Sequence, residues 1–405
     1  MSKPVLVLLA YHFPPARAIG GARPYRFYKY LKRLGYDCHV LTAASQENIA
    51  SEDDVHHVPD PLRLRPKQGL AWQAERIGWK FLLRGDLALG WSDCAYQAGL
   101  ELIRQNRGHD VTILSSAPPL GTHLAAWRLA ARTGCKWIAD FRDPIVSPGV
   151  DSAVFPSVAG MIESRVLAAS DLTLANTDAM RDSWAEKYGD PRNKVHVLWN
   201  GFDKEDGITA NPPPPREQLV LSHVGELYGG RDLRPVLLAF ERLIKNGQVD
   251  PAKILVRQIG AAEPSELPPR DFVDRARGDG WLELCPPVPP AQAKLMACES
   301  DGLLLVQPHT AVQVPGKLFE YLRMGRSILA FVVRGSPVER ILQKSGVPHS
   351  CLYPEQTAEQ MEAKVLEYLA GLGRPPVAPS EWFEATFEAS RQAQELDRLI
   401  QSLKS

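Results

Sequence analysis

The residues best suited to chemistry lie in two glycine-bearing stretches of the C-terminal half of the chain. The first begins at His223 and reads His-Val-Gly-Glu-Leu-Tyr-Gly-Gly-Arg-Asp-Leu-Arg-Pro. It predicts a strand, a loop and then Arg231 just ahead of a helix. Arginine donates paired hydrogen bonds to phosphate oxygens, and the amides of a helix N-terminus add partial positive charge. We therefore expect Gly225, Glu226 and Arg231 to belong to a diphosphate site.

The second stretch, Val314 to Leu329, predicts a loop, a short helix, a glycine stop and a buried strand. Lys317 stands at the helix start and Glu320 follows one turn later on the same face. Lys317 and nearby amides could hold phosphates while Glu320 accepts hydrogen bonds from a ribose diol. A solvated helix glutamate is the alternative for Glu320, and its apolar neighbours argue against it. The other candidates for donor binding here are Pro315, Gly316 and Leu318.

Polar residues of the N-terminal half follow several candidate strands. Ligands of open α/β sheets bind at the carboxyl ends of the strands, so these loops are candidates for sugar or acceptor contact. The loop after the first strand holds Gly20 and Gly21, which could let the backbone approach phosphate or sugar; a flexible turn that needs glycine only for its geometry is the alternative. The contact candidates are His12, Arg23, Asp140, Arg142 and Asn200.

Two further residues of these loops, His123 and Asp143, are candidate catalytic groups together with Arg231 and Lys317. An ordinary polar contact is the alternative for His123. Arg142 stands between two carboxylates in Asp140-Phe-Arg-Asp143, and this pattern fits a structural ion-pair network as well as it fits direct ligand contact. Both interpretations of Arg142 stay open at the level of sequence.

The elements that must position these residues alternate between short β-rich runs and helical patterns, which is typical of parallel sheets with crossover helices. Four prolines, Pro212 to Pro215, within the polar stretch 204–218 favour extended backbone and mark a domain boundary. We predict an α/β protein with Rossmann-like, doubly wound domains at 1–205 and 206–375. The remaining residues, 376–405, include a helical pattern from Glu381 to Leu403 that we expect to return to the N-terminal domain.

The predicted strands of the first domain are Val5 to Ala10, Cys38 to Thr42, Val111 to Ser115, Lys136 to Ala139, Leu172 to Ala175 and Val195 to Trp199, with a helix at Arg23 to Leu34. The predicted strands of the second are Leu219 to Val224, Ile254 to Ile259, Trp281 to Leu284, Gly302 to Val306 and Ser327 to Val333. Its predicted helices are Leu233 to Lys245, Ala291 to Glu299, Lys317 to Met324 and Val338 to Lys344.

Composition excludes several classes of function. The chain has 47 basic and 47 acidic residues, so no global field attracts nucleic acid. The six cysteines lack zinc-ligand spacing and suit reduced thiols. No apolar run has the length of a signal peptide core or a membrane span, so we expect a cytoplasmic protein. The absence of Gly-x-Gly-x-x-Gly argues against a nicotinamide or flavin enzyme, and the absence of Asp-x-Asp accords with a metal-free mechanism.

The sequence resembles family 4 of the glycosyltransferases, which are retaining enzymes with the GT-B fold. The resemblance spans essentially the whole chain, and its most specific motif is Pro315-Gly-Lys-Leu-Phe-Glu-Tyr-Leu322. The other matching segments are Gly20-Gly-x-Arg23, Trp137 to Pro144, Ala175 to Asp178, Asn200 to Asp203 and Gly225 to Asp232.

This resemblance implies two Rossmann-like domains that face each other across a cleft, with the donor nucleotide on the C-terminal domain and the acceptor on the N-terminal one. Arg231 and the Gly316–Leu318 loop would face the diphosphate and Glu320 the ribose. Two positions depart from the family pattern. Val312 stands where members carry a glutamate that contacts the transferred sugar, and Glu226 stands where they often carry a basic residue. Neutralising the leaving group is thereby left mainly to Arg231 and Lys317.

The expected function is retaining transfer of a hexose from a nucleotide-sugar to a glycan, a lipid-linked acceptor or a small molecule, with no cofactor and no metal. A sugar-nucleotide epimerase of the same fold, or a partner that binds nucleotide-sugar without turnover, are the alternatives. The basic and aromatic segment Pro61 to Trp91 could lie on an anionic membrane at the inner face. A helix packed on its own domain with basic residues reaching outward is the alternative for that segment.

Overall fold

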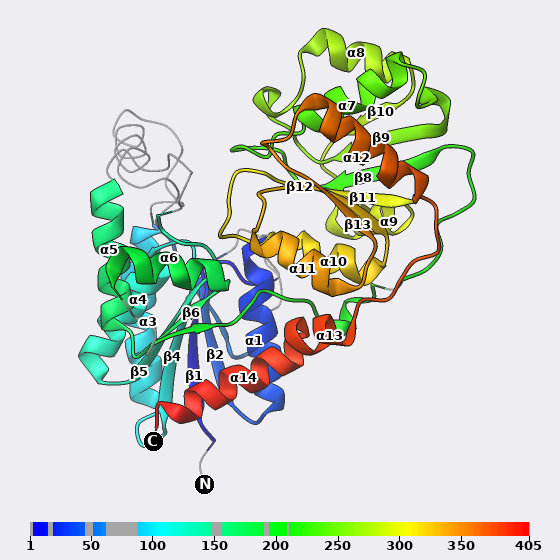
Figure 1. Cartoon of the computed structure of the whole chain (residues 1–405). Coiled ribbons are helices and arrows are strands. Elements are labelled where there is room, and N and C mark those ends of the chain that lie inside the picture. The colour runs from blue at the N-terminus through cyan, green and yellow to red at the C-terminus, as the bar shows by residue number, and fades with distance from the viewer. Residues whose placement is uncertain are drawn as a thin grey trace. The chain divides into compact units, whose positions relative to one another are not determined.

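The computed structural model describes residues 3–14, 19–44, 52–61, 88–146, 156–189, 194–208 and 210–404. The chain forms two compact units (Figure 1). The N-terminal unit consists of Met1–Asp203 and Phe387–Ser405, and the C-terminal unit is Lys204–Thr386. The chain thus crosses between units at 203/204 and 386/387, whereas the sequence places the divisions at 205/206 and 375/376.

The N-terminal unit is built on a parallel seven-stranded sheet with the order β3-β2-β1-β4-β5-β6-β7. The order reverses between β1 and β4, so the loops that leave these two strands diverge at a switch point. Every residue of both strands is buried, as expected where helices cover both faces of a parallel sheet. The strands are β1 (Val5–Leu9), β2 (Asp37–Ala43), β3 (Val55–Val58), β4 (Val111–Ala117), β5 (Lys136–Phe141), β6 (Leu172–Ala175) and β7 (Val195–Val197).

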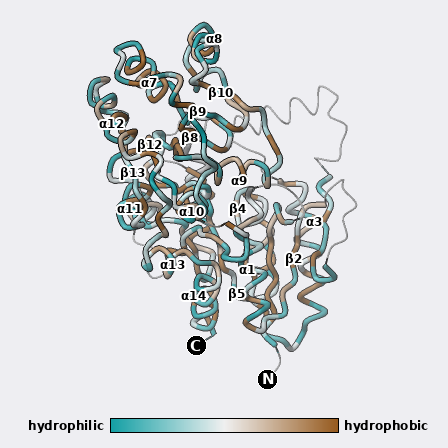
Figure 2. Tube along the Cα trace, turned by 90° about the vertical axis from the view of Figure 1, so that its right-hand side faces the viewer, coloured by the Kyte–Doolittle hydropathy of each residue, from teal (hydrophilic) through white to brown (hydrophobic). Residues whose placement is uncertain are grey.

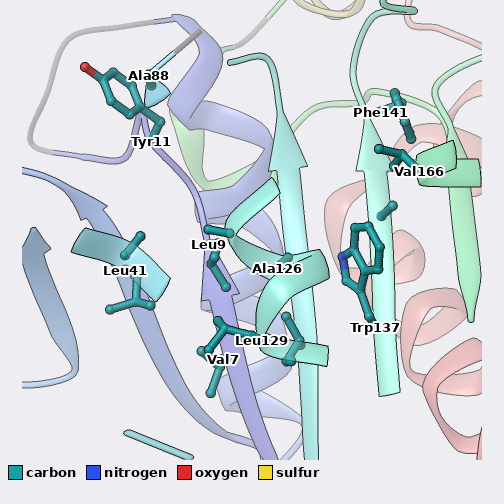
Figure 3. Close-up of a cluster of buried hydrophobic side chains, with 14 of the residues drawn as sticks. Val7, Leu9, Tyr11, Leu41, Ala88, Ala126, Leu129, Trp137, Phe141 and Val166 are labelled. Carbon is teal, nitrogen blue, oxygen red and sulfur yellow. The ribbon is translucent and has the colours of Figure 1, made fainter. Parts of the chain in front are cut away.

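Helices cover both faces of this sheet and create two hydrophobic cores. On one face, Ala126 and Leu129 pack with Val7 and Leu9 of β1 and with Trp137 of β5 (Figure 3). On the other face, the first and the last helix of the chain pack on β1 and β2. The helices are η1 (Ile19–Gly21), α1 (Ala22–Arg33), α3 (Leu89–Gln105), α4 (Gly121–Thr133), α5 (Pro156–Ala169), α6 (Asp178–Tyr188) and α14 (Ala389–Ser402).

The C-terminal tail contains two helices where the sequence predicts one from Glu381 to Leu403. Helix α13 (Glu381–Phe387) belongs to the C-terminal unit apart from its last residue, and α14 belongs to the N-terminal unit. Glu388 lies between them with an extended backbone, and its carboxylate accepts hydrogen bonds from the amides of Ser390 and Arg391. The flanking residues also exchange backbone hydrogen bonds with Phe202. The break therefore arises because the chain pairs with the segment after β7 before α14 begins.

The C-terminal unit repeats the same architecture with a parallel six-stranded sheet of order β10-β9-β8-β11-β12-β13. Here the order reverses between β8 and β11, so the loops that leave these two strands form the second switch point. The strands are β8 (Leu219–Val224), β9 (Ile254–Ile259), β10 (Leu282–Cys285), β11 (Gly302–Gln307), β12 (Ser327–Val332) and β13 (His349–Leu352). The helices are η2 (Lys204–Asp206), α7 (Arg234–Lys245), η3 (Pro251–Lys253), η4 (Pro264–Glu266), α8 (Arg270–Gly278), α9 (Pro290–Cys298), α10 (Lys317–Met324), α11 (Pro337–Ser345) and α12 (Ala358–Ala370).

Local capping signals define several helix starts. The Thr177 hydroxyl accepts from the Met180 amide at the start of α6, and the Ser336 hydroxyl accepts from the Glu339 amide at the start of α11. Thr357 and Gln360 form a reciprocal capping box at α12. These bonds satisfy amides that have no partner within the helix. Polar and apolar residues are interspersed along the helices (Figure 2).

The hypothesis of membrane contact by Pro61 to Trp91 falls largely on residues 62–87, which lie outside the described residues. Trp91, at its end, is fully buried in the core of the N-terminal unit. None of the helices in the described ranges combines the length and the apolar character that crossing a bilayer requires.

We expect Leu396→Ala in α14 to lower the free energy of unfolding by about 2 to 5 kcal/mol, because Leu396 is fully buried in the core shared with α1. Urea denaturation followed by tryptophan fluorescence measures the change. Arg398→Ala is the control in the same helix, since that side chain is 72% exposed. Equal stability of the two variants would contradict the packing of α14 on the N-terminal unit.

Candidate functional site

The first component of the site is the loop that follows β8 at the switch point of the C-terminal unit. Gly225 begins it with φ of 121°, a left-handed backbone that favours glycine. The loop is pinned to the segment after β9, because Leu227 donates its amide hydrogen to the Ala261 carbonyl at 2.9 Å. Gly230 likewise donates to Glu266 Oε1 at 3.0 Å. The loop that the sequence predicts as a diphosphate site is therefore held at both ends by a neighbouring strand connection.

Arg231 stands at the end of this loop, three residues ahead of α7. Its guanidinium lies over the ring of Tyr228, 4.3 Å from the ring centroid. Such stacking restrains the plane of the guanidinium while its edge keeps its hydrogen-bond donors. Glu226, the predicted member of the site on the same loop, is exposed.

Lys317 begins α10 and brings its ammonium back to the β8 loop. Its Nζ lies 2.8 Å from His223 Nε2. A Cβ atom added to Gly225 would lie 2.8 Å from the same Nζ, so a side chain at this turn would displace the ammonium. In the segment before the helix, the Leu318 amide donates to the Pro315 carbonyl at 3.0 Å and so serves the turn itself. The two glycine-bearing stretches of the sequence thus meet through Lys317.

The charge of Lys317 responds to the other two predicted donor-site residues. Burial is the main cause that lowers the pKa of Lys317 to about 7, and the nearby positive charge of Arg231 contributes to the same decrease. Glu320 acts in the opposite sense and favours the ammonium. Arg231, Lys317 and Glu320 therefore share one electrostatic environment within the C-terminal unit.

Glu320 projects from the more exposed side of α10. Its side chain is 45% exposed and lies 3.9 Å from Lys294 Nζ. Its apolar neighbours are buried, and one of them, Tyr321, accepts a hydrogen bond from the Val224 amide at 2.8 Å. Those neighbours hold α10 against the end of β8, whereas the carboxylate of Glu320 remains accessible to solvent. In the sequence, the apolar neighbours of Glu320 argue against a solvated glutamate, but in the structure its carboxylate is partly exposed to solvent.

Three residues of this site were not among the sequence candidates. His223 and Gln258 are buried side by side on β8 and β9, with His223 Nδ1 2.5 Å from Gln258 Oε1. His309 follows β11, and burial lowers its pKa to about 4, with Arg231 as the next cause. Its Nδ1 is buried and has no hydrogen-bond partner in the described part of the chain. His223 and Gln258 could have been found from the sequence because each is a polar residue inside a mostly apolar predicted strand.

In the N-terminal unit, Arg23 and Asp140 form a buried ion pair, with Arg23 at 3% and Asp140 at 0% exposure. The Arg23 guanidinium donates to Asp140 at 2.7 to 3.0 Å and also to the carbonyls of Leu198 and Trp199. Ser116 donates to the same carboxylate at 2.8 Å. The two predicted acceptor contacts are thus bonded to one another, and they join α1, β4, β5 and the segment after β7.

Arg142 and Asn200 extend this network. The Arg142 guanidinium donates to the carbonyls of Gly20 and Pro118, and a Cβ on Gly20 would collide with it. Asn176 accepts a hydrogen bond from the Asn200 amide at 2.6 Å and donates to the Arg142 carbonyl at 2.9 Å. Of the two interpretations of Arg142, these bonds favour the structural one, although its partners are carbonyls and not the two flanking carboxylates.

Two predicted N-terminal residues remain closer to solvent. His12 is partly buried and contacts the ring of Tyr11 edge-on, at 5.0 Å between centroids. Asp143 is exposed and acts electrostatically on Arg142. Neither belongs to the buried ion pair, and of the two only Asp143 is exposed.

His123 is fully buried at the start of α4. Its Nδ1 lies 2.8 Å from Ser115 Oγ, which also accepts a hydrogen bond from Trp137 Nε1. Its Nε2 is buried without a hydrogen-bond partner among the described residues. Burial lowers the pKa of His123 to about 3, and the neighbouring Arg142 also lowers it. The ring is therefore neutral near pH 7 and cannot supply a positive charge to a leaving group.

No cluster of three or more His, Cys, Asp or Glu side chains suited to a metal ion occurs within the described ranges. The basic side chains of the predicted donor site are those of Arg231 and Lys317.

Comparison with known proteins supports the family resemblance. The model of Glycosyltransferase Family 4 matches residues 22–206. No significant sequence match to a curated protein is found. Among solved structures, an α,α-trehalose-phosphate synthase from Burkholderia xenovorans in complex with glucose-6-phosphate is similar with a TM-score of 0.64 and 12% identity, covering 100% of both chains.

Two further solved structures show the same fold. HepE from Anabaena in complex with UDP and glucose has a TM-score of 0.62 and 12% identity, over 99% of this chain and 100% of HepE. The catalytic domain of starch synthase IV from Arabidopsis thaliana, bound to ADP and acarbose, has a TM-score of 0.61 and 11% identity over 100% of both chains. The predicted GT-B fold is confirmed, and the resemblance to family 4 is confirmed over the matched residues.

The buried His123 predicts a specific acid sensitivity. Its folded-state pKa of about 3 lies below its ordinary value of about 6.5, so the unfolded chain binds the extra proton between these values. The contribution of His123 to stability is present above pH 6.5 and is lost as the pH falls. We expect the loss between pH 7 and pH 5 to be smaller by about 2 kcal/mol in His123→Gln than in the wild type.

Urea denaturation at both pH values measures this difference, and His57→Gln, at an exposed histidine of β3, is the control. An identical loss of stability in wild type and His123→Gln would contradict a buried, neutral His123.

Proposed function

We propose that this chain is a retaining glycosyltransferase. It would move a hexose from a nucleotide-sugar bound on the C-terminal unit to a glycan, a lipid-linked acceptor or a small molecule bound on the N-terminal unit. The GT-B fold and the match of residues 22–206 to Glycosyltransferase Family 4 support this class of reaction. The UDP and ADP in the HepE and starch synthase structures make these two nucleotides the first candidates for the leaving group.

The observation that carries the proposal is the grouping of Arg231, Lys317 and Glu320 around the Gly225 turn. One guanidinium and one amine lie close enough for their charges to interact, and a carboxylate one turn along α10 acts on the same amine. A nucleoside diphosphate offers the complementary set of charges, because its phosphates accept from the cations and its ribose hydroxyls donate to the carboxylate. The arrangement therefore suits the nucleotide half of a sugar donor.

The reaction would proceed by attack on the same face of the sugar from which the diphosphate leaves. The bond between the anomeric carbon and the phosphate oxygen breaks with its electron pair on the phosphate, and the acceptor oxygen bonds to that carbon. The acceptor proton passes to the departing phosphate oxygen. Arg231 and Lys317 would stabilise the negative charge that develops on the phosphate, which is the main electrostatic demand of the step.

Two alternatives share the donor site. A sugar-nucleotide epimerase would convert the donor without an acceptor, and a binding partner would hold the donor without turnover. The buried Val312, at the position where family members carry a sugar-contacting glutamate, favours the second of these. Incubation with donor alone and with donor plus acceptors, followed by product analysis, separates transfer from both alternatives.

We expect transfer to continue in the presence of EDTA, because fixed side-chain cations would take the role of a divalent metal at the diphosphate. Measurement of turnover before and after chelation, with Mg²⁺ or Mn²⁺ added back, checks this. Activity that EDTA abolishes and a metal restores would show that Arg231 and Lys317 are insufficient.

We expect Arg231→Ala and Lys317→Ala each to reduce kcat/KM by a factor equivalent to about 3 kcal/mol, the range seen when a charge-stabilising donor is lost. Arg234→Ala is the matched control, since Arg234 lies three residues further on but is exposed and paired with Asp232 at 2.8 Å. A thermal-shift screen of nucleoside diphosphates and their sugars identifies the donor first. Near wild-type turnover in both alanine variants would reject this assignment of the site.

A further inference from the structure

Two buried polar side chains, His223 and Gln258, lie opposite one another in the register of β8 and β9. They are 0% and 1% exposed. The strands of a parallel sheet covered on both faces are normally apolar, and a buried polar group costs free energy unless it finds a partner. Both side chains are therefore expected to have hydrogen-bond partners that offset this cost.

The hydrogen bonds of the pair have a fixed direction. Gln258 Nε2 donates to the Gly225 carbonyl at 2.8 Å, which orients the amide so that its oxygen faces His223. His223 Nδ1 lies 2.5 Å from that oxygen and must carry the ring proton, because an amide oxygen can only accept. His223 Nε2 is then an acceptor, and it faces Lys317 Nζ at 2.8 Å. Burial holds the pKa of His223 well below its usual range, so the ring stays neutral.

These contacts form a closed series that begins and ends at Gly225. The series runs from the Gly225 carbonyl through Gln258 and His223 to Lys317. The Lys317 ammonium lies beside Gly225, where an added Cβ would be 2.8 Å from Nζ. A lysine has a flexible four-carbon stem and a point charge that does not fix its own direction. Here the direction is set by neutral groups in the centre of the sheet.

We propose that His223 and Gln258 are positioning residues, which hold the Lys317 ammonium at the Gly225 turn where the diphosphate of the donor binds. This inference rests on the proposed function, and it adds two residues that act through Lys317. Loss of either should displace the ammonium, weaken the binding of nucleoside diphosphate and lower kcat. The charged groups that act on Lys317 are Arg231 from the β8 loop and Glu320 from α10, and both remain in place in the variants below.

The first test measures the binding of UDP and of ADP by calorimetry. We expect His223→Leu to weaken binding about ten- to a hundredfold, the range for a lost hydrogen bond to a charged group. His223→Gln should recover most of the affinity, because its amide oxygen reaches the place of Nε2. Ser222→Ala is the matched control on β8, since it removes a buried hydrogen bond to Ser300 of 2.7 Å without touching the series.

The second test follows Lys317 itself in the ligand-free protein. An NMR titration of ¹³C-labelled lysine, with the signal assigned through Lys317→Arg, reports the pKa of the amine. A hydrogen bond to the charged form raises a pKa, so we expect His223→Leu to lower the pKa of Lys317 below that of the wild type. Ser222→Ala should leave it unchanged. A general loss of stability in β8 would not produce this difference between the two variants.

The outcomes separate this inference from the proposed function. If Lys317→Ala weakens UDP or ADP binding while His223→Leu binds like Ser222→Ala and leaves the pKa of Lys317 unchanged, the positioning role is overturned and the donor site stands. If the wild type binds none of the nucleoside diphosphates or nucleotide-sugars in the thermal-shift screen, the proposed function is overturned and this inference with it. Weakened binding in His223→Leu, recovered in His223→Gln, supports both.

Discussion

The proposed donor site is organised around the repulsion between two positively charged side chains, Arg231 and Lys317, at one end of a parallel sheet. Their proximity is recorded in the lowered pKa of Lys317, which burial and the charge of Arg231 produce together. The two positive charges therefore repel each other in the folded protein, and the carboxylate of Glu320 only partly offsets this repulsion. In the proposed function, the negative charge of a diphosphate would relieve this repulsion, and its attraction to the two side chains would be strong because charges in a partly buried site are screened less than in water.

The charged candidate residues of the N-terminal unit serve its structure instead. Arg23 and Asp140 are both buried and bonded to each other, and Arg142 donates to two backbone carbonyls. Such pairs contribute little net stability, but breaking one leaves an uncompensated buried charge. Their effect is to fix the loops after β1, β4 and β5 and the segment after β7 relative to one another. The exposed Asp143 is then carried on a loop of defined geometry.

Most of the fold could be predicted from the sequence because continuous apolar runs and helical periodicity are local signals. The short strands β3, Val-His-His-Val, and β13, His-Ser-Cys-Leu, lacked that signal and needed the neighbouring strand to define them. The break at Glu388 was equally hidden, since it depends on backbone pairing with Phe202, far away in sequence.

The motif glycines and Arg231, Lys317 and Glu320 were predictable as donor-site candidates. The His223–Gln258 pair was not, because only the register of two strands brings it together.

A lysine at position 317 is better suited to this site than an arginine would be. An arginine remains charged at any accessible pH, so the protein would have to fold with two permanent cations at the Gly225 turn. The amine of Lys317 can instead lose part of its charge near neutral pH and still donate a hydrogen bond to His223. The neutral His223 ring makes this possible, because its Nε2 can accept a hydrogen bond from Lys317 whether the amine is charged or neutral. The buried His223–Gln258 pair and the Lys317 amine therefore depend on each other, because without its partner each would be a buried polar group with an unsatisfied hydrogen bond.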